Sequence, residues 1–198
     1  MKKMKKSTIV VALVATNALV LNATANSGNW SNIKPIKSKI EKTGDFLPAT
    51  NLANPQKGIT YKYYQFKDEL ANVDSIAKLT PVSTGIANVI DLSKSTREEN
   101  YAFIFEGYVK IPADDNYVFS INSDDGSKLV IDDKVEILNE GYHAEEEVEK
   151  DIKLAAGFHK IKVWFWQGGG EFALSVSWKS SAIPKTTLPS SVLFYNQK

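Results

Sequence analysis

The residues with the clearest chemical potential are two adjacent carboxylates, Asp124 and Asp125, which are followed by Gly126. Asp-Gly between two alternating segments is a strong turn signal, because glycine accepts a positive φ without a steric cost. Like charges on neighbouring residues repel, so we expect a cation or a set of backbone N–H donors among them. The alternative is that Asp124 only accepts backbone N–H bonds and caps the turn.

The segments on both sides of this acidic pair have the two-residue period of β-strands. Tyr117, Phe119 and Ile121 alternate with smaller or polar residues before the pair, and a similar alternation resumes at Leu129. We therefore predict a β-hairpin over residues 117–133 that carries the two carboxylates at its tip.

Strand patterns also fill the rest of the chain. The clearest lie at residues 101–106, 161–166 and 172–179, and in the last of these an inward-facing row ends at Trp178. Turn signals recur about every eight to twelve residues, and no internal repeat is present. The sequence therefore predicts an all-β fold, an antiparallel β-sandwich or a barrel-like domain.

Four ordered motifs carry a resemblance to a known family. They are Phe105-Glu106-Gly107-Tyr108-Val109-Lys110-Ile111-Pro112, Tyr117-Val118-Phe119, Ser123-Asp124-Asp125-Gly126-Ser127-Lys128-Leu129-Val130-Ile131-Asp132 and Leu154-Ala155-Ala156-Gly157-Phe158-His159-Lys160-Ile161-Lys162-Val163. With these motifs the chain closely resembles the PA14 domain family, named for a fragment of anthrax protective antigen. The resemblance implies a β-sandwich or barrel-like module that often binds glycans and often accompanies glycoside hydrolases or adhesins.

The same resemblance implies a metal site at the acidic pair. In the adhesin branch of the family, two adjacent aspartates share a cis peptide bond and bind Ca²⁺ with an asparagine from a neighbouring loop, and the ion contacts sugar hydroxyls. The matching positions are Asp124 and Asp125, and hard oxygen ligands of this kind suit Ca²⁺. The second loop should be residues 167–171, which contain no asparagine. The expected substitutes are Glu171, which we place in the metal site, Gln167, Asn122 and backbone carbonyls.

Aromatic residues supply a second set of candidates, because aromatic faces stack on sugar rings and tolerate a wet surface. Trp164 and Trp166 share one face of their predicted strand, which is a platform if solvent reaches it and core if a second layer covers it. We expect at least one of the two to be core. The predicted ligand-binding set is Asp124, Asp125, Tyr142, His143, Trp166 and Gln167.

The two histidines are expected to differ. His143 lies in an acidic excursion and is the better binding candidate, whereas His159 follows the Gly157 turn and is expected to make structural hydrogen bonds. Two histidines, no cysteine and no Gly-x-Ser-x-Gly motif give no basis for a hydrolytic triad. We therefore expect a binding module and not an enzyme.

The first 25 of the 198 residues have the order of a secretory signal peptide: a basic start, an apolar run and Ala23-Thr24-Ala25. The apolar run at residues 9–21 is shorter than the roughly 20 residues that span a bilayer. Residues 26–57 are interpreted as a leader or linker, and residues 58–196 as the domain. Removing the signal peptide lowers the number of basic residues from 24 to 20, whereas the number of acidic residues stays at 23. This balance predicts no nucleic-acid or membrane partner.

The sequence as a whole predicts a secreted, extracellular or periplasmic, carbohydrate-binding module that Ca²⁺ assists. Its expected partners are glycans, together with a glycoside hydrolase or a cell-surface protein. The alternative function is a non-catalytic structural, adhesion or protein-docking module that has no sugar site.

Overall fold

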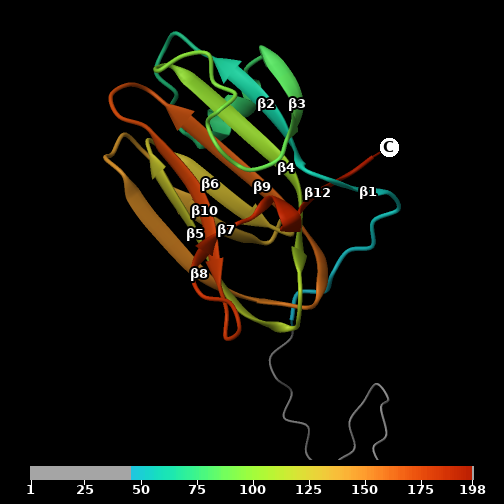
Figure 1. The fold of residues 1–198 in the computed structure, drawn as a ribbon. Coiled ribbons are helices and arrows are strands. Elements are labelled where there is room, and N and C mark those ends of the chain that lie inside the picture. Colours follow the sequence, from blue (N-terminus) through green and yellow to red (C-terminus); the bar gives the residue numbers. More distant parts are fainter. Residues whose placement is uncertain (1–45, 198) are drawn as a thin grey trace, which may run out of the picture. The chain divides into compact units, whose positions relative to one another are not determined.

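The computed structural model describes residues 46–197, which form a β-sandwich of two antiparallel sheets (Figure 1). The large sheet contains β1 (Pro55–Lys57), β2 (Ile59–Gln65), β3 (Ser83–Ala87), β4 (Tyr101–Ile111), β6 (Ser127–Ile131), β7 (Val135–Asn139), β9 (Gly157–Gln167) and β12 (Leu193–Asn196). The small sheet contains β5 (Asp115–Asp124), β8 (Glu146–Leu154), β10 (Ala173–Lys179) and β11 (Thr186–Thr187). Two short 3₁₀ helices are η2 (Val73–Lys78) and η3 (Ser190–Val192). The predicted all-β fold class is confirmed.

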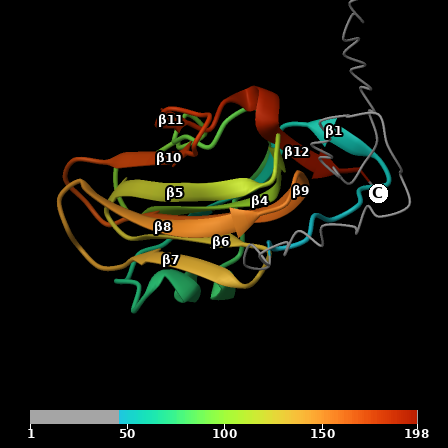
Figure 2. The ribbon, with the colours of Figure 1, turned by 90° about the horizontal axis from the view of Figure 1, so that it is seen from below.

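The strand order runs β1-β12-β4-β9-β6-β7 in the large sheet and β11-β10-β5-β8 in the small one. The long ladder between β4 and β9 is the backbone of the large sheet, and it pairs residues from Tyr101↔Gln167 to Ile111↔Gly157. On its other edge β4 pairs with β2 and β12, and β2 also pairs with β3. Figure 2 shows the layers from below, with β5 and β10 over β6 and β7.

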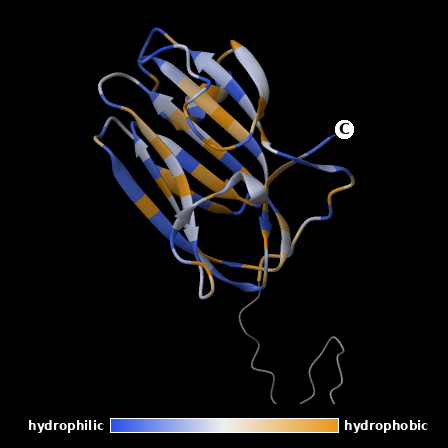
Figure 3. Ribbon diagram, viewed as in Figure 1, coloured by the Kyte–Doolittle hydropathy of each residue, from blue (hydrophilic) through white to orange (hydrophobic). Residues whose placement is uncertain are grey.

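The core fills the space between the two sheets, because alternate side chains of each strand point inward. The hydropathy colouring of Figure 3 shows this alternation along the strands. Phe103 of β4 packs on Tyr63 and Phe105, with ring centroids 5.0 and 5.3 Å apart. From the small sheet, Trp178 stacks on Tyr117 at 5.7 Å and is 4% exposed. The prediction that Trp178 faces inward is therefore confirmed.

The predicted hairpin over residues 117–133 is wrong in its pairing. Both strands exist, but β5 pairs with β8 and β10 in the small sheet, whereas β6 pairs with β7 and β9 in the large sheet. The Asp124–Gly126 segment is therefore a crossing between the two sheets. Period-two alternation indicates a strand and the face that it buries, but it does not indicate which neighbour the strand joins.

The domain begins before residue 58, where the sequence-based boundary was placed. Leu47 forms an isolated bridge to Leu154, and Thr50 forms one to Phe158. β1 then pairs with β12, so the segment from residue 46 to 57 contributes contacts to the domain and is not a separate leader. The predicted signal peptide lies outside the described residues, and within residues 46–197 no helix is long and apolar enough to cross a membrane.

Candidate functional site

The candidate site is built where the crossing between the sheets meets three loops. These loops precede β4 and follow β7 and β9. The Asp125 carboxylate joins two of them, because Oδ1 accepts the backbone N–H of His143 at 3.2 Å and Oδ2 accepts that of Gly168 at 3.0 Å. The carbonyl of Gly168 in turn accepts the N–H of Asn100 at 3.2 Å, which attaches the loop before β4.

A buried polar network holds the two ends of the crossing together. The hydroxyls of Ser123 and Ser127 lie 2.7 Å apart, and the Asn139 amide donates to Ser123 Oγ at 3.0 Å and to the carbonyl of Glu146 at 2.9 Å. Buried polar groups that are fully paired in this way fix a unique local geometry. The network therefore ties β5, β6, β7 and β8 together directly below the acidic pair.

Gly126 allows the crossing to pass over a tryptophan. A Cβ atom at this position would lie 2.3 Å from Nε1 of Trp166, closer than real atoms approach. The peptide bond between Asp124 and Asp125 is cis, as the resemblance to the adhesin branch implies.

The two carboxylates are neighbours in different environments. Asp125 is 4% exposed and receives the two backbone N–H bonds described above, whereas Asp124 is 9% exposed and accepts no hydrogen bond from any described residue. Burial and the adjacent Asp125 charge raise the pKa of Asp124; His143 opposes the rise, whereas Glu171 and Glu145 add to it. The Asp124 carboxylate therefore sits in a negative environment that provides no donor.

These two carboxylates fit part of a Ca²⁺ shell. Asp124 offers both oxygens, and the oxygens of Asp125, each holding one N–H bond, keep lone pairs. Ca²⁺ takes six to eight oxygen ligands, so carbonyls, waters or ligand hydroxyls would have to supply the rest. Among residues 46–197, no three His, Asp or Glu side chains converge closely enough to hold a metal by themselves.

The predicted metal ligand Glu171 lies in the loop after β9 and is exposed. Its backbone carbonyl accepts the Gln167 amide N–H at 2.9 Å, and its charge is felt at Asp124. Asn122, another of the expected substitutes, donates to Glu145 Oε1 at 2.5 Å. Glu171 thus lies beside the acidic pair, and its side chain forms no three-residue metal-binding cluster with the described His, Asp and Glu residues.

Gln167 is fully buried and connects the crossing to the loop after β9. Its Oε1 accepts the N–H of Asp125 at 3.1 Å, and its Nε2 donates to the carbonyl of Glu171. With both ends of the amide engaged, Gln167 positions the site and does not face a ligand. Its predicted role as a direct binding residue is corrected to a positioning role.

The predicted role of Trp166 as an exposed stacking face is wrong, because Trp166 is only 1% exposed. It packs in a second hydrophobic cluster with residues of β2, β4 and η2, including Tyr64, Ile104 and Ile76. The second layer that covers this face is formed by η2 and its flanking residues. Trp164 on the same strand is half-buried, with the Lys128 and Lys162 ammonium groups 4.7 and 4.5 Å from its ring centroid.

Tyr142 is the exposed aromatic residue of the predicted set. It is 54% exposed, and its ring meets Trp166 edge-on with centroids 4.5 Å apart. It also covers Gly168, where a Cβ atom would lie 2.4 Å from Tyr142 Cε1. Trp166 therefore acts indirectly, by supporting the ring that solvent reaches.

His143 joins the site mainly through its backbone N–H, which bonds to Asp125. Its Nδ1 lies 2.8 Å from the carbonyl of Ala144, which assigns the ring proton to Nδ1. Nε2 is buried and has no partner among residues 46–197. His143 thus contributes to the site, whereas His159 lies elsewhere and is structural, as predicted.

Three contributors were missed from the sequence. Glu140 accepts the N–H of Val73 at 3.0 Å and that of the Trp166 indole at 3.4 Å, which anchors the loop after β7. Gly168 and Asn100 act through their backbones, so side-chain chemistry gave no signal for them.

The strand pattern at residues 172–179 predicts an inward-facing row that begins at Phe172. This prediction is wrong for Phe172, which is 51% exposed in the loop after β9.

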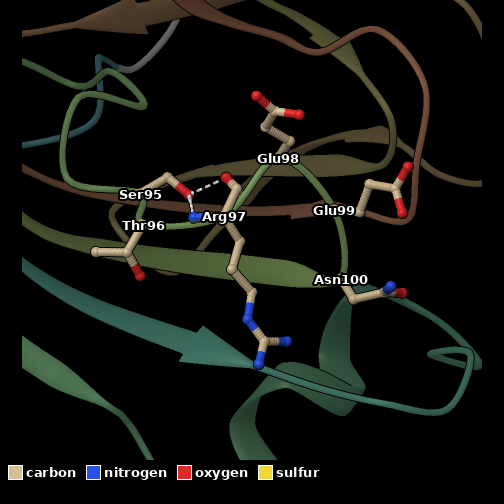
Figure 4. Close-up of a pocket in the computed structure, with 6 residues that line it drawn as sticks. All are labelled: Ser95, Thr96, Arg97, Glu98, Glu99 and Asn100. Carbon is tan, nitrogen blue, oxygen red and sulfur yellow. Dashed lines mark hydrogen bonds between the residues drawn. The ribbon is translucent and has the colours of Figure 1, made fainter.

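A shallow concavity lies in the loop before β4 and is lined by residues 95–100 (Figure 4). Ser95 Oγ donates to the carbonyl of Arg97 at 2.7 Å and accepts its N–H at 3.2 Å, which closes the turn. Arg97 points away from Glu98 and Glu99 in this view. The concavity is polar, and Asn100 connects it to the loop after β9.

Comparison with known proteins identifies the family of this chain. The sequence matches the PA14 domain over residues 55–191, so the chain belongs to the PA14 domain family. A search among curated proteins found no match.

Solved structures with the same fold share little sequence with this chain. An anti-sigma factor domain-containing protein has a TM-score of 0.58 and 23% identity over 70% of this chain and 48% of its own, so the chain spans about half its length. The PA14 sugar-binding domain from an RTX adhesin has a TM-score of 0.58 and 18% identity, covering 70% and 98%. The epithelial adhesin 6 A domain from Candida glabrata, in complex with Galβ1-3GlcNAc, has a TM-score of 0.55 and 14% identity, covering 75% and 92%.

Proposed function

We propose that this chain is a carbohydrate-binding module whose ligand contacts Ca²⁺ held by Asp124 and Asp125. The observation that carries the proposal is the state of Asp124, a nearly buried carboxylate that receives no hydrogen bond from residues 46–197 and stands among other negative charges. A cation offsets such a charge directly, whereas the neighbouring Asp125 is already oriented by two N–H donors. When bound, Ca²⁺ would neutralise both carboxylates and offer open coordination positions to hydroxyl groups.

The surrounding loops supply the shape of the proposed sugar site. Tyr142 presents an exposed ring, which Trp166 and Gly168 hold in place, and His143 lies at the same rim. Amphipathic rings of this kind stack on sugar faces. The two adhesin relatives are sugar-binding by their descriptions, which supports glycans as the partner class of this chain.

The test of this function is a glycan array that contains β-galactosides, probed with the purified domain in Ca²⁺ and in EDTA. We expect binding in Ca²⁺ that EDTA abolishes and that Asp124→Asn removes, because the amide keeps the shape and loses the charge. Glu149→Gln, on the exposed face of β8, is the matched charge control and should bind as the wild type does. Glycan binding that persists in EDTA would sink the calcium proposal. No glycan binding at all would favour a docking or structural module.

We also propose that the domain is exported, on the basis of the basic and apolar start of the chain and of Ala23-Thr24-Ala25. The partners would then be extracellular or periplasmic glycans, with a glycoside hydrolase or a surface protein as a companion. N-terminal sequencing of secreted material should begin at Asn26. Membrane-bound material that retains Met1 would contradict export by cleavage.

A further inference from the structure

A groove opens on the outer face of the large sheet, away from the acidic pair. It forms where β2 and β12 diverge along β4, since β2 pairs with β4 only as far as Glu106 and β12 begins at Tyr108. The acidic pair lies near the Tyr101 end of the β4–β9 ladder, whereas the groove lies around its middle, from Glu106 to Tyr108. Its volume is about 390 Å³, within the range of roughly 300–1,000 Å³ that is usual for ligand pockets. It is lined by Thr60, Glu106, Tyr108, Lys160, Tyr195 and Asn196.

The lining combines a half-buried ring with polar groups that have free hydrogen-bonding capacity. Tyr108 is half-buried, and its hydroxyl bonds to no residue within 46–197. The side-chain oxygen of Asn196 accepts the N–H of Asn54 at 2.9 Å, which leaves its amide N–H₂ free to donate within the described chain. Rings with a polar edge, next to amide and carboxyl groups, are the surfaces that sugars contact by stacking and hydrogen bonding.

The charges around the groove are weighted toward lysine. Glu106 lies 3.9 Å from Lys160 Nζ and 4.0 Å from Lys162 Nζ, distances too long for hydrogen bonds, so neither ammonium group is committed to it. Lys160 does donate to Asp133 at 2.8 Å. On the same outward face, Lys62 and Lys110 are exposed and have no ion pair among the described residues. Four lysines thus face two carboxylates, and the local excess of positive charge attracts anions.

We propose that this groove is a second saccharide site, independent of Ca²⁺, and that it binds oligosaccharides carrying carboxylate groups. One sugar ring lies against Tyr108, and its hydroxyls bond to Glu106 and Asn196. Carboxylates on this and the neighbouring sugars face Lys160, Lys162 and Lys110. The two sites do not depend on each other, because they share no residue and lie at different points along the same ladder.

The test uses the domain in EDTA, so that the proposed calcium site is inactive. Oligogalacturonate is the acidic probe, and neutral galacto-oligosaccharides of the same length are the control in titration calorimetry. We expect binding of the acidic probe only, weakened by added salt because exposed charges are screened. Tyr108→Ala should weaken it by at least about fivefold, the loss expected for a central anchor. Lys162→Gln and Lys110→Gln should each weaken it about two- to fivefold.

Two matched variants separate this site from the rest of the molecule. Lys153→Gln makes the same charge change on the small sheet and should leave the affinity unchanged. Tyr142→Ala removes the exposed ring of the loop site and should also have no effect here. If Tyr108→Ala proves unstable in a melting experiment, Tyr108→Phe removes only the hydroxyl and should still weaken binding measurably.

Equal binding of neutral and acidic probes, or an affinity that Tyr108 and Lys162 variants leave unchanged, would overturn the proposal. So would self-association of the domain that Tyr108→Ala abolishes, because the groove would then be covered by a second copy. Loss of Ca²⁺-dependent glycan binding in Asp124→Asn, with oligogalacturonate binding intact, would support two separate sites.

Discussion

Asp124 and Asp125 show how neighbouring residues of one type acquire different tasks. The Asp125 carboxylate receives N–H bonds from two loops and thereby fixes their positions. The Asp124 carboxylate receives none from residues 46–197, and His143 only partly offsets the negative charges of Asp125, Glu171 and Glu145 around it. Asp124 therefore keeps both carboxylate oxygens available, and Asp125 fixes the loops around them.

The substitution Asp124→Asn tests this division of labour through stability. Burial and the Asp125 charge raise the pKa of Asp124 in the folded state. When no cation is bound, the ionised Asp124 carboxylate therefore destabilises the fold once the pH exceeds the pKa that this group has in the unfolded chain. In EDTA at pH 7, we expect the variant to have a melting temperature equal to or above that of the wild type. In Ca²⁺ the wild type should gain stability as RT ln(1 + [L]/Kd), and the variant should not. A variant that melts lower in EDTA would contradict this account.

His159 carries a second prediction at the residue scale. It is fully buried, with Nδ1 2.6 Å from Asp132 Oδ2 and Nε2 2.8 Å from the carbonyl of Ala155. Both nitrogens face acceptors, so only the doubly protonated ring can donate both bonds. Burial alone would lower the pKa of His159, but the bonds to Asp132 and Ala155 outweigh it, and the pKa is raised.

A histidine with a raised folded pKa stabilises the protein fully below its unfolded pKa, and that stability is lost as the pH rises through the folded pKa. We therefore expect the melting temperature to fall as the pH rises above the unfolded pKa of about 6.5 and through the raised pKa of the folded state, measured in EDTA. Asp132→Asn removes the carboxylate that faces Nδ1 of His159, so it should flatten this fall in melting temperature. The variant should still fold, because asparagine tolerates the positive φ of 53° at this position. Asp133→Asn, the adjacent change in the same turn, should leave the slope unchanged. A wild-type slope that survives Asp132→Asn would refute the assignment.

At the scale of the elements, the crossing between β5 and β6 determines the architecture of the site. A hairpin would keep both strands in one sheet, whereas the crossing sends β5 to one layer and β6 to the other. The acidic pair thus lies at an edge of the sandwich, where loops from both sheets reach it. The Ser123, Ser127 and Asn139 network is the fixed base of this arrangement.

The small sheet is anchored to the core by the inward row of β10. Trp178 stacks on Tyr117 and lies 6.1 Å from the Phe119 ring, all within one layer of the core. We expect Trp178→Ala to reduce the free energy of unfolding by about 3–5 kcal/mol, the range for truncating a large buried aromatic residue. Calorimetric melting should show a decrease on the order of 10 °C.

Trp178→Phe is the informative control for this row. The indole Nε1 is buried and has no partner within residues 46–197. Phenylalanine therefore loses packing volume, which destabilises the fold, and removes an unpaired buried donor, which stabilises it. Its cost should therefore be well below that of alanine. A melting temperature of Trp178→Ala within a degree or two of the wild type would contradict the burial of the β10 row in the core.

For the molecule as a whole, sequence reasoning reached the fold class, the family and the acidic pair. Period-two alternation predicted β4, β5, β9 and β10, because each buries one face of the sandwich. It could not assign β5 and β6 to different sheets, since that choice depends on partners far along the chain. The alternation pattern left Trp166 as a candidate ligand contact. The residues of η2 that cover it approach through tertiary packing, which a local sequence pattern does not reveal. The backbone donors that hold Asp125 were also invisible, because any residue type can supply an N–H.

The pairing of β1 with β12 places the first strand of the domain beside its last, in the register Pro55↔Asn196 to Lys57↔Phe194. Tension applied between residue 46 and the end of β12 would first load the bridges of Leu47 and Thr50. Once these are released, it would separate the residue pairs of the β1–β12 ladder one after another and not all at once. Tyr195 and Asn196 belong to that ladder, so the groove would then lose part of its wall. The acidic pair lies near the Tyr101 end of the β4–β9 ladder and outside this first line of rupture. If both proposed sites bind, a module tethered through both ends would release the ligand of the groove under force before the ligand of the acidic pair.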